Sequence, residues 1–176
     1  MTPDDLGRLF ASFRQSAFRL ETLPAYDVEE EAESLRAWRA GEPRPAWHED
    51  REWCRLVAHA RAAGKFMQRV RVVRRPLSDY IRLEFDWGYP DNIAAGEDIR
   101  ILELTGEDQL PFVPDADRGY DFWCFDGLTV VRLEYDGAGR FVQPVDVSHH
   151  AQQFIACQDY ARRRAVPFSD YRATIF

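Results

Sequence analysis

Residues 120–145 read YDFWCFDGLTVVRLEYDGAGRFVQPV, and this stretch does most to decide the fold. Its three apolar, partly alternating segments (120–125, 128–135 and 140–145) are separated by an Asp-Gly pair and by a second turn at 136–139. Asp-Gly between such segments is a strong signal for a tight hairpin. The stretch predicts three consecutive antiparallel strands, and their alternation predicts that four side chains are buried: Trp123, Phe125, Val131 and Leu133.

Two further strands are expected upstream of the hairpins. Residues 66–73 contain Val70, Val72 and Val73, and residues 99–104 form a second apolar run. Residues 77–87 fit two structures, since Ile81, Leu83, Phe85 and Trp87 alternate with polar residues while helical spacing is also satisfied. The alternation slightly favours a strand there. Residues 105–119, rich in Pro, Gly and Asp, are expected to form a loop.

The first 64 residues carry helical patterns. An apolar stripe over 3–22 predicts one helix, with Thr2 as its cap and Pro3 in its first turn. Residues 27–40 and 48–63 predict two more, and 148–164 a C-terminal helix. The expected fold is therefore α+β: three N-terminal helices, then a mainly antiparallel sheet of about five strands with a C-terminal helix packed on it.

Length and composition predict one folded domain. The chain has 176 residues, 45% of them hydrophobic and 14% aromatic, which suffices for a core. We take 1–176 as a single domain with a helical part (1–64) and a sheet part (65–176). The net charge of −7 argues against a broad nucleic-acid surface, so we expect no specific duplex binding by the isolated chain.

Localisation and redox state follow from what the sequence contains. No window approaches the roughly 18–20 consecutive apolar residues of a membrane span, and the first five residues carry acid where a signal peptide carries base. These features predict a cytoplasmic protein without a membrane partner. Cys54, Cys124 and Cys157 are too widely spaced for a CxxC pair, so we expect buried, reduced thiols.

Familiar catalytic and metal-binding motifs are missing from the sequence. No two of the four histidines stand four residues apart, as helical zinc ligands would, and neither a phosphate-binding glycine loop nor a Gly-x-Ser-x-Gly elbow occurs. We therefore expect no metal, no cofactor and no assigned catalytic residue. Paired acids would suit metal-assisted or glycosidic chemistry, but solvated strand ends beside turns explain the carboxylates equally well; they are Glu97, Asp98, Asp121, Asp126, Glu134 and Asp136.

Arginines inside the predicted strands are the candidate binding residues. Arg71 shares a face with Arg69 if the strand is regular. With Arg100 and Arg132 in other strands, three or four guanidiniums could converge on one face and bind an anion or an acidic partner. The competing explanation is an exposed face of cross-strand Arg–Glu pairs, with Glu84, Glu103 and Glu134 as partners.

Several runs resemble an uncharacterised actinobacterial domain-of-unknown-function family over nearly the whole length. They are Leu9-Phe10, Phe13-Arg14 and AFRLE (17–21), VRVV (70–73) with LSDY (77–80), NIAAGEDIR (92–100), and DFWCFD (121–126) with Tyr135-Asp136. Members are often encoded beside helix-turn-helix regulators of development or antibiotic production. The resemblance implies a regulatory or accessory context and carries over no catalytic residue.

A second likeness concerns architecture. The succession from the strand at Val70 through Gly96 to the strands after Asp121 is similar to half of a phospholipase-D-like domain, which implies that 77–95 are helical. That enzyme class uses a His-x-Lys pair, whereas the only lysine here, Lys65, has Ala63 two positions before it. The likeness therefore implies a non-catalytic, sensor- or effector-like derivative.

Three functional hypotheses remain from the sequence. The first is a regulatory or accessory interaction protein that works with a helix-turn-helix regulator and senses a small anionic ligand through Arg71, Arg100 and Arg132. The second is an enzyme of specialised metabolism that uses the carboxylates or the arginine face. The third, direct DNA binding, is disfavoured by the charge and by the lack of a helix-turn-helix signature.

Overall fold

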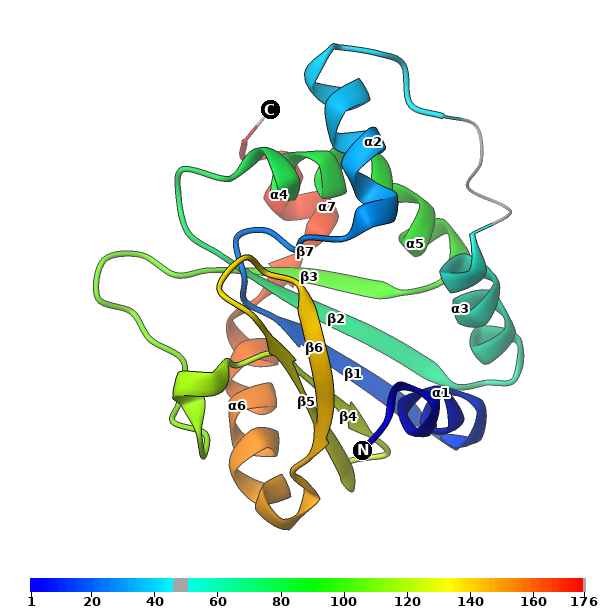
Figure 1. Cartoon of the computed structure of the whole chain (residues 1–176), viewed down its shortest axis with the longest axis vertical. Helices are drawn as coiled ribbons and strands as arrows, with labels where there is room; N and C mark the ends of the chain where they lie inside the picture. The colour runs from blue at the N-terminus through cyan, green and yellow to red at the C-terminus, as the bar shows by residue number, and fades with distance from the viewer. Residues whose placement is uncertain (46–50, 176) are drawn as a thin grey trace.

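The computed structural model describes residues 1–45 and 51–175, and its centre is a seven-stranded mixed sheet (Figure 1). The strand order is β6-β5-β4-β1-β2-β3-β7. β1, β2 and β3 run parallel to one another, and the remaining pairings are antiparallel. The strands are β1 (Ser16–Glu21), β2 (Phe66–Val73), β3 (Asp98–Glu103), β4 (Phe122–Phe125), β5 (Thr129–Tyr135), β6 (Phe141–Asp146) and β7 (Val166–Pro167).

The expectation of three N-terminal helices followed by a five-stranded antiparallel sheet is wrong. Helix α1 (Pro3–Ser12) begins as predicted, with Thr2 and Asp5 forming a capping box, but it ends ten residues before the predicted end at 22. Residues 16–21 instead form β1, which lies in the middle of the sheet (Figure 1). Ala17 and Leu20 lie on opposite faces of β1, and both are apolar because both faces of this central strand are buried. Their three-residue spacing therefore matches a helical stripe although the segment is a strand.

Helices connect the parallel strands. α2 (Glu29–Arg39) and α3 (Glu52–Ala62) lie between β1 and β2. The predicted helix over 48–63 thus corresponds to α3, and its first three residues lie outside the described residues. α4 (Asp79–Leu83), the π-helical turn η2 (Glu84–Gly88) and α5 (Tyr89–Ala95) lie between β2 and β3.

The slight preference for a strand over 77–87 is therefore wrong, and the helical alternative is correct. Parallel strands need a long crossover connection, which a strand at this point would not provide. Ile81, Leu83, Phe85 and Trp87 are all buried. The short helix α4 and the wider π-helical turn η2 bury side chains on most of their surface. The alternation of apolar and polar residues in 81–87 therefore does not indicate a strand.

The predictions for the hairpin region are confirmed. β4, β5 and β6 pair in sequence as antiparallel neighbours, and Trp123, Phe125, Val131 and Leu133 are buried. Helix α6 (Ala151–Arg164) follows, preceded by the 3-10 turn η4 (Ser148–His150). The expected loop over 105–119 holds the 3-10 turn η3 (Ala116–Arg118), and α7 (Phe168–Arg172) closes the chain.

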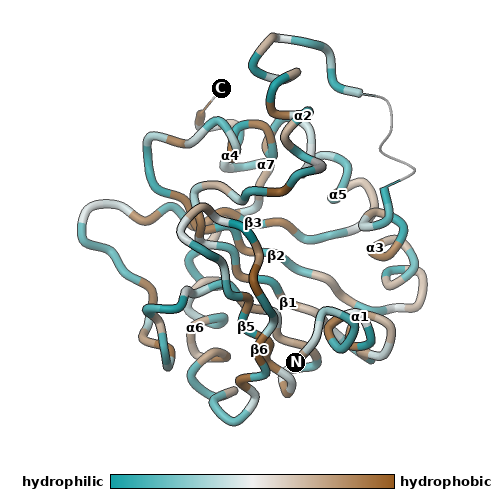
Figure 2. The backbone as a smooth tube through the Cα atoms, viewed as in Figure 1, coloured by the Kyte–Doolittle hydropathy of each residue, from teal (hydrophilic) through white to brown (hydrophobic). Residues whose placement is uncertain are grey.

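Helices cover both faces of the sheet. On one face α6 packs over Leu20, Val70 and neighbouring apolar residues. On the other face α1 and α3 cover one apolar cluster around Met67 and Trp123, whereas α4, η2, α5 and α7 cover a second around Ile99 and Ile101. Figure 2 shows apolar segments running through the sheet and polar ones over the outer turns.

The three cysteines are buried and free, as predicted. Burial raises the pKa of the Cys124 thiol to about 11 and that of Cys157 to about 12. Both thiols are therefore protonated at neutral pH and pack as small apolar groups. In the described part of the chain, no helix combines the length and the apolar character needed to cross a bilayer.

Candidate functional site

A polar strip separates the two apolar clusters that share one face of the sheet. It is formed by four residues of the two central strands: Arg19 and Glu21 of β1, and Arg69 and Arg71 of β2. In the parallel register Arg19 lies beside Arg69 and Glu21 beside Arg71. Because side chains of a strand alternate between faces, all four project to the same side. Arg69 and Arg71 share a face, as the sequence predicts.

Glu21 is the common acceptor of the three guanidiniums. Arg69 Nη1 donates to Glu21 Oε1 at 2.6 Å, Arg19 Nε to the same oxygen at 3.4 Å, and Arg71 Nη1 to Oε2 at 3.3 Å. Burial by itself would raise the pKa of the Glu21 carboxyl, but Arg69, Arg19 and Arg71 outweigh it and lower that pKa to about 2. Glu21 is therefore a fixed anion that holds the arginines together.

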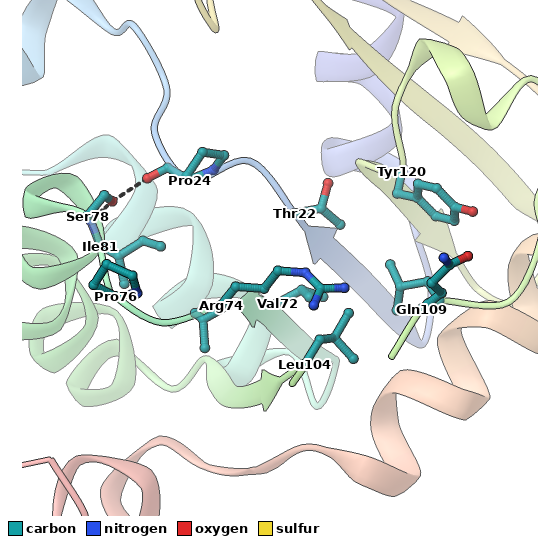
Figure 3. A pocket seen from close by; sticks show the side chains of 12 residues that line it. Thr22, Pro24, Val72, Arg74, Pro76, Ser78, Ile81, Leu104, Gln109 and Tyr120 are labelled. Atoms are coloured by element: carbon teal, nitrogen blue, oxygen red, sulfur yellow. Dashed lines mark hydrogen bonds between the residues drawn. The ribbon is translucent and has the colours of Figure 1, made fainter. Parts of the chain in front are cut away.

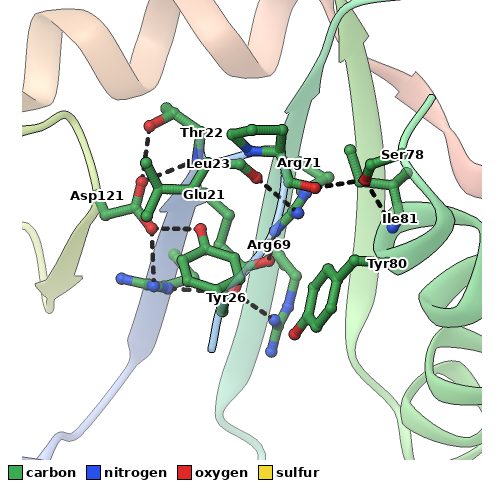
Figure 4. A network of polar contacts seen from close by, with 12 residues as sticks. Glu21, Thr22, Leu23, Tyr26, Arg69, Arg71, Ser78, Tyr80, Ile81 and Asp121 are labelled. Carbon is green, nitrogen blue, oxygen red and sulfur yellow. Dashed lines mark hydrogen bonds and ion pairs between the residues drawn. The ribbon is translucent and has the colours of Figure 1, made fainter. Parts of the chain in front are cut away.

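A second carboxylate, Asp121, binds the start of the segment that follows β1. Its Oδ1 accepts hydrogen bonds from the backbone N–H and the hydroxyl of Thr22 at 2.8 and 2.7 Å. Its Oδ2 accepts from Arg19 Nη2 at 3.1 Å and from the Tyr26 hydroxyl (Figure 4). Arg71 Nη2 donates to the Leu23 carbonyl oxygen at 2.8 Å. The segment 22–26 is thereby tied to the polar strip.

Tyrosines enclose the arginines. The rings of Tyr26 and Tyr80 lie 5.0 and 5.9 Å from the Arg71 guanidinium carbon, distances typical of cation–π contacts. The Tyr80 hydroxyl donates to Glu31 of α2 at 2.7 Å. Burial raises the pKa of both Tyr26 and Tyr80 above the ordinary tyrosine value. These phenols remain neutral donors, so the positive charge at this point comes from arginine alone.

The network leaves buried hydrogen-bonding groups unused. Among the residues that the structure describes, Arg19 Nη1, Arg71 Nε and Tyr89 Oη are buried and have no hydrogen-bond partner. The Arg19 and Arg71 residues are 4% and 1% exposed. Most buried polar groups in proteins are paired, and an unpaired one calls for an explanation such as a bound ligand, a water molecule or stored strain. The strip is thus a polar surface with donor capacity to spare.

A cavity of about 860 Å³ lies over this strip, and we call it the arginine cavity. Its inner wall is the β1–β2 strip with Arg19, Arg69 and Arg71. Its outer wall comes from the start of α2 and the residues before it, and it carries acidic side chains, among them Glu29 and Glu31. The remaining wall includes Arg51, Trp53, Tyr80, Glu84, Tyr135 and Arg140.

Glu84 is a group in the cavity wall whose charge changes near neutral pH. It begins the π-helical turn η2, where a Cβ added to Gly88 would lie 2.8 Å from Glu84 Oε1. Glycine at 88 therefore leaves room for this carboxyl. Burial, reinforced by the negative charge of Glu31, raises the pKa of Glu84 to about 7, although Arg69 and Arg71 oppose the shift. A carboxyl with such a pKa can take up or release a proton at pH 7.

The structure does not bring the three arginines predicted from the sequence onto one face. Arg71 lies in the arginine cavity, but Arg100 pairs with Val70, whose side chain is on the opposite face under α6. Arg132 pairs with Phe122 on that same opposite face, several strands away from Arg100. The alternation within a strand shows which of its residues share a face, but not which faces of different strands coincide. Only the register between strands places Arg71, Arg100 and Arg132 relative to one another.

Arg100 and Arg132 have different surroundings. Arg132 is 3% exposed and donates to Glu134 of the same strand at 2.9 Å, so it belongs to a buried pair within β5 and not to the exposed cross-strand pairs of the competing explanation. Arg100 is partly exposed, binds Asp98 at 3.1 Å and lines a hollow with Arg162 and Arg163 of α6. Whether either residue binds a partner stays a prediction.

Sequence reasoning missed most of the residues around the cavity. The helical stripe over 3–22 places Arg19 and Glu21 in a helix, and nothing in the sequence pattern indicates a role for Tyr26. In the sequence Asp121 is one of several carboxylates near turns, and Glu84 is a candidate surface partner for arginine. A usable signal was present in 17–21, where Arg19 and Glu21 alternate with Phe18 and Leu20.

In the described residues, no group of three or more His, Cys, Asp and Glu is placed to hold a metal ion.

No curated protein matches the chain. A family model described as a domain of unknown function, DUF6879, matches residues 4–173 and so covers both the sheet and every wall of the arginine cavity. The chain therefore belongs to the DUF6879 family.

Proposed function

We propose that this protein is a regulatory or accessory protein that binds a small anionic ligand in the arginine cavity and works with a helix-turn-helix transcriptional regulator. One observation carries the ligand proposal: Arg19 and Arg71 on the inner wall each keep a buried N–H without a hydrogen-bond partner among the described residues. Such a group costs about 1–3 kcal/mol when unsatisfied. An oxyanion in the cavity would accept from these donors and recover that cost.

Cavity size and charge favour a small ligand. A volume of about 860 Å³ is in the usual range of about 300–1,000 Å³ for small-molecule sites. The acidic outer wall, with Asp27, Glu29 and Glu31, repels a polyanion that would extend beyond the arginines. The net charge of −7 acts in the same direction, so direct duplex binding remains the disfavoured alternative.

Helix α2 links the cavity to a partner in this proposal. It forms the outer wall, and its contacts with the helical layer include Tyr80 Oη to Glu31, Trp38 Nε1 to Asp86 at 2.9 Å and Arg39 to Asp79 at 2.8 Å. A ligand that contacts α2 from inside can change how this helix is held. The proposal of a helix-turn-helix regulator as partner rests on the resemblance found in the sequence.

The ligand proposal is tested by filling the cavity from outside. Ala32 of α2 is exposed and lines the cavity, so Ala32→Trp adds bulk without touching an arginine. Glu33→Trp places the same side chain on the exposed surface next to it and is the matched control. Isothermal titration with inorganic phosphate, together with mass spectrometry of anions released from protein purified from its host, provides the measurement.

We expect phosphate or a co-purified anion to bind the wild type and Glu33→Trp, and to be lost in Ala32→Trp at an unchanged melting temperature. Binding that survives in Ala32→Trp would place the anion elsewhere. No bound anion in either assay would refute the ligand proposal. The partner proposal is tested separately, by pull-down from the host and reconstitution with the purified regulator. The complex should respond to Ala32→Trp and not to Glu33→Trp.

An enzyme of specialised metabolism is the second candidate, and Glu84 is the observation that favours it. A carboxyl with a pKa raised to about 7 beside arginines can act as a general base on a bound anion. The same host-purified material distinguishes the two candidates. A sensor returns its ligand chemically unchanged after long incubation, whereas an enzyme converts it, at a rate that Glu84→Gln should reduce by about 10²–10⁴-fold.

A further inference from the structure

A second cavity, of about 380 Å³, lies beyond the carboxyl ends of the three parallel strands (Figure 3). Thr22 follows β1, Val72 is near the end of β2, and Leu104 follows β3. The carboxyl ends of parallel strands commonly leave a crevice where ligands bind, because the chain turns away there into the connecting segments. We call this space the strand-end cavity.

The segment 22–24 separates the strand-end cavity from the arginine cavity. Thr22 and Pro24 line the strand-end cavity, while the Leu23 carbonyl between them accepts a hydrogen bond from Arg71 on the other side. The Pro24 carbonyl accepts from the Ser78 hydroxyl, which fixes the segment to the start of α4. The two cavities are thus distinct, and an inference about one does not rest on the other.

Among the residues that the structure describes, the wall of the strand-end cavity is mainly apolar and carries one cation, Arg74. Val72, Leu104, Ile81 and Tyr120 supply hydrocarbon and ring surface. Figure 3 shows the Arg74 side chain lying across the space, with its guanidinium between Thr22 and Leu104. A mostly apolar wall with few polar groups is the usual composition of a site for a small organic molecule.

The hydrogen bonds of Arg74 go to backbone carbonyls, although the Asp108 carboxylate is close enough for its charge to interact with the guanidinium. Its Nη1 donates to the Gly106 carbonyl at 3.1 Å and its Nη2 to the Asp108 carbonyl, so its hydrogen bonds order the 105–108 turn. The Asp108 carboxylate instead accepts from the Thr105 N–H and hydroxyl at 3.3 and 3.2 Å. In the described residues the guanidinium of Arg74 therefore forms no hydrogen-bonded pair with a carboxylate and is available to one on a ligand.

We propose that the strand-end cavity binds a small amphipathic carboxylic acid, with its hydrocarbon part against Val72, Leu104 and Tyr120 and its carboxylate on Arg74. Complementarity of shape and charge supports this class of ligand. An uncharged apolar molecule would offer no anion to the Arg74 guanidinium, and a small inorganic anion would leave the apolar wall uncovered.

The test uses octanoate as the probe, with 1-octanol as a probe of the same length without the charge. Binding to the full chain is measured by isothermal titration and by saturation-transfer NMR. Arg74→Gln removes the cation, and Arg75→Gln is the matched control, because Arg75 is adjacent in sequence but pairs with Glu103 outside the cavity. Gln109→Trp, at an exposed position of the cavity wall, fills the space.

We expect octanoate to bind the wild type and Arg75→Gln alike, and at least about tenfold more weakly to Arg74→Gln. 1-Octanol should bind the wild type and Arg74→Gln equally, and Gln109→Trp should lose both probes. The proposal is overturned if octanoate fails to bind the wild type, if Arg74→Gln binds it as tightly as Arg75→Gln does, or if Gln109→Trp retains it. Since Gln109→Trp leaves Arg74 in place, it decides the matter even if Arg74→Gln loosens the 105–108 turn.

Discussion

Replacement of Glu21 by glutamine is the most direct test of the polar strip. Glu21 is 7% exposed and accepts from Arg19, Arg69 and Arg71, so the change leaves three largely buried guanidiniums without their shared anion. Breaking a buried ion pair by removing one partner costs about 3–5 kcal/mol. The lowering of the Glu21 pKa from 4.5 to about 2 corresponds to about 3 kcal/mol, which agrees.

The pH dependence of this loss has a defined sign. The folded pKa of Glu21 is depressed, so its contribution to stability is complete above the unfolded value of 4.5 and is lost as the pH falls toward about 2. The difference in unfolding free energy between wild type and Glu21→Gln should be largest at pH 7 and about half as large at pH 3.

Urea denaturation followed by tryptophan fluorescence measures both quantities, with an unchanged slope against urea as the check on two-state behaviour. Glu103→Gln is the matched control, since Arg75, which pairs with Glu103, has a half-exposed side chain and this pair should contribute at most about 1 kcal/mol, while a glutamine oxygen can still accept from the Tyr171 hydroxyl. A Glu21→Gln loss no larger than the control's, or one that does not change between pH 7 and pH 3, would refute the reasoning.

Two further predictions concern the cavity wall and the core. Burial raises the pKa of Glu84 in the folded protein to about 7. The contribution of Glu84 to stability is therefore present below about pH 4.5 and is lost as the pH rises through 7. Glu84→Gln should match the wild type at pH 4 and be more stable by about 1–3 kcal/mol at pH 8. Parallel denaturation midpoints for the two proteins from pH 4 to pH 8 would contradict this. Trp123→Ala should destabilise by about 3–5 kcal/mol, since the ring packs against Phe10, Trp53 and Phe125. A urea midpoint equal to that of the wild type would remove Trp123 from the core.

Local signals in the sequence were sufficient where a segment's neighbours in space are also its neighbours in the chain. The meander over 120–145 is of this kind, because its turns fix both the pairing and the faces of its strands. The Thr2 cap and the C-terminal helix are likewise local, and both were predicted from the sequence.

Only the tertiary structure decided the central strand and the cavity. Residues 16–21 become β1 through hydrogen bonds to β2, some fifty residues later, and to β4, about a hundred later. The spacing of Ala17 and Leu20 fits a helix, whereas the alternation of Arg19 and Glu21 with Phe18 and Leu20 fits a strand, so the local pattern alone does not choose between them. The register with β2 then places Arg19, Glu21, Arg69 and Arg71 side by side, while the register with β3 puts Arg100 on the opposite face. The sequence determines which residue types alternate along each strand. Which charged residues become neighbours depends on the pairing of distant strands, and this pairing exists only once the sheet has formed.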